Sequence, residues 1–193
     1  MKISTVAGKV YGAIVAAFLV LPIGTALLVW FADGNARGRF DNAKVISTRY
    51  ILSVVLLMVL LVPFFIVADR RKAGASLTWG EAMVAAVYVF LLLFWLYGVV
   101  PHEFLNWADA ELAWRPDKII IGHGSTWTWW KALQSFPIVI HKQILRDVLA
   151  VVLYVVGLGG FIWACSFWNK RNEPTKAVET TSAYGRPLVT GRS

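Results

Sequence analysis

Four long stretches of the chain carry no charged residue, and they limit its fold more than any other feature. They are residues 10–32, 50–68, 82–101 and 148–169. A helix needs roughly 20 predominantly apolar residues to cross about 30 Å of hydrocarbon, and each stretch comes close to that length. Strands of a membrane barrel are only about 10 residues long and alternate in polarity, unlike these unbroken runs. The sequence therefore predicts an all-α integral membrane protein with four transmembrane helices.

The composition supports this reading and sets the expected domain boundaries. Hydrophobic residues make up 58% of the 193 residues, and the mean hydropathy is +0.62. The first stretch follows a basic segment, as in a signal peptide, but it exceeds the usual length of about 7–15 apolar residues, so we expect it to be retained. We expect residues 1–169 to form one transmembrane domain in contact with the lipid bilayer. The polar residues 170–193 are expected to form a flexible tail.

The net charge of +8 arises from basic residues that lie beside the apolar stretches. They cluster at Arg70, Arg71 and Lys72, and again at Lys170 and Arg171. Juxtamembrane cations of this kind fix the orientation of a membrane protein and meet anionic lipid. We therefore expect no nucleic-acid partner. The clusters favour a multi-pass protein of the bacterial plasma membrane with cytoplasmic termini.

The segment between the third and fourth spans, residues 102–143, holds all three histidines and five of the ten tryptophans. Pro101 ends the third span and is suited to the first turn of a new helix. The apolar stripe that follows predicts an amphipathic helix lying in the interface plane. Residues 118–121 predict a short apolar strand or a membrane anchor, and Ser125 or Thr126 is suited to cap a second interfacial helix.

Two groups of residues are candidates for contacts with the membrane interface or with partner subunits. Tryptophans between the third and fourth spans are typical anchors at the level of the lipid headgroups. Small residues in the fourth span allow close helix packing, either within this chain or against a partner. The candidates are Trp107, Trp114, Trp127, Trp129, Trp130, Gly157, Gly160 and Ala164.

The same segment offers the candidate cofactor ligands. A quinone headgroup would be held by His102 with Glu103 or Asp109, and a haem or metal ion by His102, His123 or His141. The spacing is not that of a zinc protease, because an asparagine stands where the second histidine of H-E-x-x-H is required. The alternative to both is an interfacial platform that binds no cofactor. The sequence requires no cofactor and leaves its identity unknown.

The span interiors contain no Asp, Glu, Lys, Arg or His. Ionisable residues within the membrane usually mark transport sites and proton relays, so a small-solute transporter is disfavoured. No nucleotide-binding loop or nucleophile elbow is present, and we predict no catalytic activity for the chain alone. The sequence favours an accessory or anchoring subunit of a multi-subunit membrane complex, specifically a respiratory electron-transfer complex. The alternative is a redox subunit that binds quinone, haem or metal through the histidines.

Overall fold

Four long helices form the molecule, as the sequence predicts. The computed structural model describes residues 3–37, 45–72, 75–127 and 130–172. Four of its helical segments are long and apolar enough to cross a membrane, namely Gly8–Gly34, Thr48–Arg70, Trp79–Ala110 and Lys142–Lys170. The predicted flexible tail lies outside the described residues beyond Asn172. The chain is thus an all-α multi-pass membrane protein.

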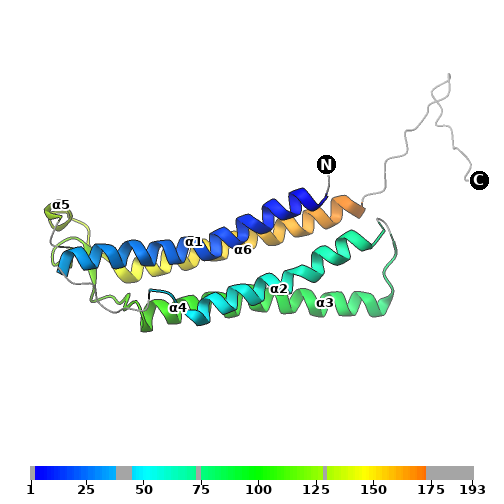
Figure 1. The fold of residues 1–193 in the computed structure, drawn as a ribbon, viewed down its shortest axis with the longest axis horizontal. Coiled ribbons are helices and arrows are strands. Elements are labelled where there is room, and N and C mark those ends of the chain that lie inside the picture. Colours follow the sequence, from blue (N-terminus) through cyan, green and yellow to red (C-terminus); the bar gives the residue numbers. More distant parts are fainter. Residues whose placement is uncertain (1–2, 38–44, 73–74, 128–129, 173–193) are drawn as a thin grey trace, which may run out of the picture.

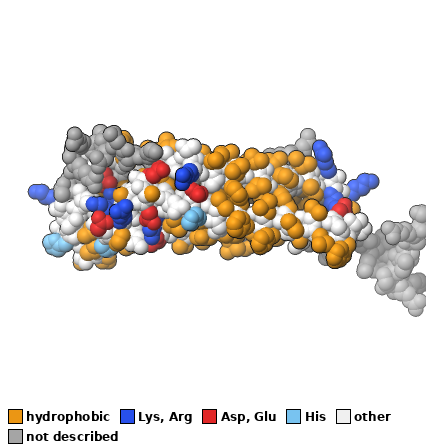
Figure 2. Space-filling model, turned by 90° about the horizontal axis from the view of Figure 1, so that it is seen from below, with side chains coloured by type: hydrophobic (Ala, Val, Ile, Leu, Met, Phe, Trp, Pro, Cys, Tyr) orange, Lys and Arg blue, Asp and Glu red, His pale blue; other side chains and the backbone are white. Residues whose placement is uncertain are grey.

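The helices pack as two antiparallel layers (Figure 1). Helix α1 (Ile3–Arg37) lies beside α6 (Lys142–Asn172), and α2 (Thr48–Arg70) lies beside the helix that begins with α3 (Trp79–Phe94). Helix α1 also packs on α2, and α6 on α4 (Val100–Ala110). Figure 2 shows a belt of hydrophobic side chains between charged ends, as a bilayer requires.

Side-chain caps set the start of the two middle helices. The Ser47 side chain accepts a hydrogen bond from the Tyr50 amide at the start of α2. Thr78 and Glu81 form a reciprocal capping box at the start of α3. Because such a box satisfies amide groups that a helix start leaves unpaired, α3 begins three residues before the expected start of the third span.

The predicted helix after Pro101 is present, but it does not lie across the membrane surface. It is α4, and it runs on from α3 in the same direction through a π-helical turn, η1 (Trp95–Val99). In this turn the Val100 amide donates to the Trp95 carbonyl, five residues back. A π turn continues a helix while it accommodates one extra residue, so Pro101 starts α4 without ending the span.

The polar end of the bundle beyond α4 is mostly irregular. Strand β1 (Ile119–Ile121) pairs antiparallel with β2 (Ile140–His141), which confirms the predicted short strand. The expected second interfacial helix is reduced to α5 (Lys131–Gln134). Ser125 does not cap it, because its hydroxyl donates to the Ile120 carbonyl and accepts from the Trp127 amide.

The buried core lies in the half of the bundle nearest this polar end. The Tyr50 ring stacks on Trp107 with a centroid distance of 5.5 Å and contacts Phe104 at 5.9 Å. Phe18 and Leu153 complete the centre of this cluster, and all five side chains are at most 2% exposed. Aromatic rings from α1, α2 and α4, together with α6, therefore close this end of the molecule.

Prolines inside the spans are matched by tyrosines from neighbouring helices. A proline has no amide hydrogen, so the carbonyl four residues earlier loses its helix donor. Pro22 leaves the Phe18 carbonyl in this position, and the Tyr50 hydroxyl of α2 donates to it. In the same way Pro101 leaves the Tyr97 carbonyl, which accepts from the Tyr154 hydroxyl of α6 at 3.3 Å.

The proline of α2 is accompanied by a related interaction. Directly after Pro63, the Tyr88 hydroxyl of α3 donates to the Leu60 carbonyl at 2.5 Å and accepts from the Phe64 amide at 3.2 Å. An α-helix would join these two backbone groups to each other. Lipid offers no hydrogen bonds to free backbone groups. The tyrosine hydroxyls therefore pair backbone groups that would be energetically costly to leave without a partner.

Candidate functional site: a cleft between four helices

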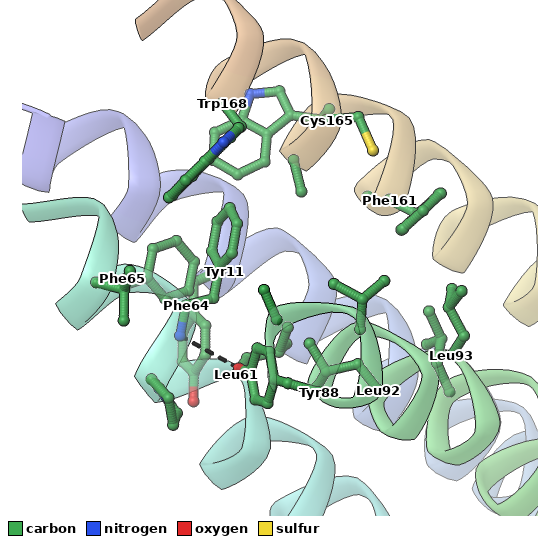
Figure 3. A pocket seen from close by; sticks show the side chains of 18 of the residues that line it. Tyr11, Leu61, Phe64, Phe65, Tyr88, Leu92, Leu93, Phe161, Cys165 and Trp168 are labelled. Carbon is green, nitrogen blue, oxygen red and sulfur yellow. Dashed lines mark hydrogen bonds between the residues drawn. The ribbon is translucent and has the colours of Figure 1, made fainter. Parts of the chain in front are cut away.

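A cleft of about 960 Å³ opens between α1, α2, α3 and α6 in the half of the bundle opposite the polar end. Its walls are almost entirely apolar (Figure 3). Tyr11 comes from α1, Phe64 from α2, Tyr88 from α3, and Phe161 and Trp168 from α6. Clefts of roughly 300–1,000 Å³ with apolar walls are typical of ligand sites, which makes this cleft the candidate functional site.

The cleft exists because α3 stands away from α6. Helix α6 packs on α4 and on the π turn, whereas α3 packs on α2. All residues of α3 are described, and none of them is buried. In the span that contains α3, 6% of the most apolar window is buried, compared with 22%, 28% and 22% in the other three spans. The bundle is therefore closed at the polar end and open at the other.

Glycines of α6 set the inner end of the cleft. A Cβ atom at Gly157 would lie 3.3 Å from the Leu96 side chain, and one at Gly160 would lie 3.1 Å from Cδ1 of Ile14. Both contacts are tight, so α6 can approach the π turn and α1 only where it has no side chain. These two glycines thus pack within the chain, and Ala164 lines the cleft itself.

The rim of the cleft is polar and mainly basic. The Arg71 side chain lines the cleft and is 20% exposed, and its Nη2 donates to the Ser76 carbonyl at 2.9 Å. The same nitrogen lies 3.6 Å from the Glu81 carboxylate, whose side chain is half exposed. Arg70, Lys72 and Lys170 are exposed at the same end of the bundle.

The tyrosine hydroxyls inside the cleft are already committed to the backbone. The Tyr88 hydroxyl bonds the Leu60 carbonyl and the Phe64 amide, and the Tyr11 hydroxyl donates to the Met58 carbonyl at 3.4 Å. These hydroxyls are therefore not free to donate to a ligand, and the charged side chains that a ligand can reach lie at the rim.

The histidines proposed as ligands do not come together. His102 and His123 are exposed, and His141 is partly buried in β2. Among the described residues, no group of three His, Cys, Asp or Glu side chains is placed to hold a metal ion. The histidine side chains seen in Figure 2 lie apart over the polar end. No common metal centre is formed by His102, His123 and His141.

The carboxylates proposed for a quinone site lie on α4, and one of them has a strong partner. The Asp109 carboxylate accepts a hydrogen bond from the guanidinium of Arg146, which also pairs with Asp147 at 2.7 Å. Glu103 is half-buried on the same helix as the exposed His102. The Asp109 pairing links α4 to the start of α6 and is a structural role that the sequence did not reveal.

The tryptophans proposed as surface anchors have several different roles. Trp107 and Trp114 are 2% and 1% exposed, which places them in the core of this chain and corrects the expectation that they face lipid or a partner. The Trp127 indole donates to the Asp33 carboxylate at 2.9 Å, and that carboxylate also pairs with the buried ammonium of Lys142. Trp130 is exposed, and Trp129 lies outside the described residues.

Sequence reasoning missed the cleft and its tyrosines. The one signal in the sequence is a tyrosine in an otherwise apolar span that packs beside a proline-containing span, as Tyr88 does beside Pro63. The pairing itself becomes visible only when the helix neighbours are known. Comparison of the chain with models of protein families, with curated proteins and with solved structures gives no match.

Proposed function

We propose that this chain is an accessory or anchoring subunit of a larger membrane complex and has no catalytic activity of its own. The observation that carries the proposal is the sparse packing of α3, which contacts α2 but contributes no buried residue to the bundle. A helix that packs so little within its own chain has surface to offer to another.

The outward side of α3 supports this role. Residues 79, 83, 86, 90 and 94 recur at intervals of four, three, four and four, so they form one stripe on the helix, which we call the outward stripe. Its members are Trp79, Met83, Ala86, Phe90 and Phe94, and none of them lines the cleft. Trp79 and Phe90 are 80% and 71% exposed. Apolar residues at this spacing are typical of helices that interlock with a partner helix.

The polar groups inside the spans also favour a structural role. The hydroxyls of Tyr50, Tyr88 and Tyr154 bond backbone carbonyls of neighbouring helices, and so does the Trp95 indole. These bonds hold helices together and leave those groups unavailable for a solute path. Transport and proton transfer through a membrane usually depend on ionisable groups at mid-depth.

The finer assignment is a respiratory electron-transfer complex in the bacterial plasma membrane. Its support is the face of α4 that presents His102 and Glu103 near one end of the bundle, where a quinol-oxidising partner would need polar groups. The basic residues at the opposite end support cytoplasmic termini, because positive residues beside spans favour the cytoplasmic side. Co-purification with haem- or iron–sulfur-containing subunits would support this assignment, and a complex without redox cofactors would contradict it.

The association itself is tested with two neighbouring alanines of α3. Ala86 lies on the outward stripe, whereas Ala85 lines the cleft. In mild detergent, the chain from its native membrane should migrate with a larger complex on a native gel. A86F should weaken this association because a bulky ring interrupts the stripe, and A85F should retain it. Migration of the unaltered chain as a monomer or homodimer alone would refute the proposal.

A further inference from the structure

We propose that the cleft binds one anionic phospholipid, with an acyl chain between α3 and α6 and the phosphate at Arg71. This inference does not depend on the proposed function, since a lipid site would exist with or without partner subunits. It follows from the shape of the cleft, the charge at its rim and the state of its hydroxyl groups.

The apolar part of the cleft matches an acyl chain in position and length. Along α3 the lining runs from Glu81 at the rim to Leu96 beside Gly157. These 15 residue steps span about 22 Å at 1.5 Å per residue. Half of a hydrocarbon core of about 30 Å is roughly 15 Å, so the cleft covers the depth of one leaflet. The gap between α3 and α6 gives a chain a lateral entrance from the bilayer.

The rim supplies the charge that a phosphate requires. The Arg71 guanidinium uses Nη2 for the Ser76 carbonyl and for the Glu81 contact. Its Nε and Nη1 make no hydrogen bond within the described part of the chain. Both parallel N–H pairs of a guanidinium include Nη2, so a phosphate here would accept single charge-assisted hydrogen bonds from Nε or Nη1. Glu81 and the exposed Asp69 oppose an anion, but Arg70, Lys72 and Lys170 outnumber these two carboxylates at this end even without Arg71.

The two most plausible competitors fit the cleft less well. A quinone needs hydrogen bonds to ring oxygens on opposite sides, and deep in the cleft the hydroxyls of Tyr11 and Tyr88 already donate to the backbone, which leaves Arg71 at the rim as a donor for one side only. A partner helix is a rigid rod about 10 Å wide, whereas an acyl chain can bend to follow walls formed by side chains of four helices.

Lipid binding is tested by native mass spectrometry of the purified full-length chain. The delipidated protein is titrated with phosphatidylglycerol, with phosphatidylcholine of the same acyl chains, and with inorganic phosphate alone. We expect one tightly retained phosphatidylglycerol, much weaker retention of phosphatidylcholine, and no retained inorganic phosphate. Equal retention of the two lipids, binding of free phosphate alone, or no retained lipid would overturn the proposal.

Matched variants locate the headgroup and the chain. R71Q should lower the affinity for phosphatidylglycerol about tenfold or more, because it removes a charge-assisted hydrogen bond to the phosphate. R70Q removes the same charge beside the cleft and should lower it about fivefold or less, as expected for general surface attraction. Equal losses in R71Q and R70Q would overturn the assignment of Arg71.

The second pair of variants tests the site without changing Arg71 or the segment around it. A85F places a ring inside the cleft and should weaken retention of the lipid, whereas A86F on the outward stripe, about 100° around α3, should leave it unchanged. The association of subunits should instead be retained in A85F and weakened in A86F. Each proposal can therefore be refuted while the other still holds. Unchanged lipid retention in A85F, or a protein segment cross-linked inside the cleft in place of lipid, would overturn the lipid site.

Discussion

Tyrosine hydroxyl groups join neighbouring helices of this protein through hydrogen bonds to the backbone. Tyr50 and Tyr154 each donate to a carbonyl that a proline has left without its helix donor, and Tyr88 lies between the Phe64 amide and the Leu60 carbonyl directly after Pro63. In a soluble protein, water could satisfy some of these carbonyls. In lipid it cannot, so proline and tyrosine act as a pair across two helices.

The Tyr50–Pro22 pair makes a prediction at this scale. Y50F should lower the free energy of unfolding by about 1–2 kcal/mol, because the Phe18 carbonyl loses its donor in a buried position. In a P22A background the alanine supplies an amide to the same carbonyl, so Y50F should cost much less there. Thermal unfolding of the four proteins in detergent, followed by circular dichroism, gives the coupling energy. Equal costs in both backgrounds would contradict the pairing.

At the scale of elements, the π turn decides where α4 points. Because η1 accommodates one extra residue, it aligns the cleft face of α3 with Phe104 and Trp107 of α4, which are buried against the other helices. The turn also brings Leu96 against Gly157. The start of α4 and the inner end of the cleft thus depend on the same five residues.

Changes in the length of this turn should have unequal effects. Deletion of Gly98 removes the extra residue and should leave an uninterrupted α-helix that keeps both faces aligned. Insertion of an alanine after Gly98 rotates α4 by about 100° and moves Phe104 and Trp107 out of the core. Size-exclusion chromatography in detergent should show a monodisperse protein for the deletion and aggregation for the insertion. The reverse order would show that the turn does not set this register.

The elements differ in how far the sequence predicts them. The four spans follow from apolar length alone, and the short strand at Ile119–Ile121 was also predicted. The continuation through Pro101 was not, since proline at a helix start and proline after a π turn give the same local pattern. The cleft could not be predicted because α3 is apolar on every side, so its sequence does not show which face meets α6. Trp107 was misplaced because an aromatic ring suits a buried core and a membrane interface equally.

At the scale of the whole molecule, the two ends differ in charge. The end where α2 meets α3 carries Arg70, Arg71 and Lys72 against Asp69 and Glu81, while the other end pairs acidic and basic residues such as Asp109 and Arg146. This difference supports the proposed orientation with the α2–α3 connection in the cytoplasm.

Cysteine labelling tests this orientation. The single cysteine is first removed with C165A, and S76C or D117C then places a thiol at one end or the other, where both native side chains are exposed. In intact bacterial cells, a membrane-impermeant maleimide should label D117C, and S76C should react only after the cells are permeabilised. Labelling of S76C in intact cells would reverse the orientation.

The closed aromatic end has a consequence for the membrane that contains this protein. Tyr50, Phe104 and Trp107 pack together beyond the inner end of the cleft. The cleft therefore does not continue through this cluster to the polar end. We therefore expect vesicles that contain the purified chain to hold an ion gradient as long as vesicles without it.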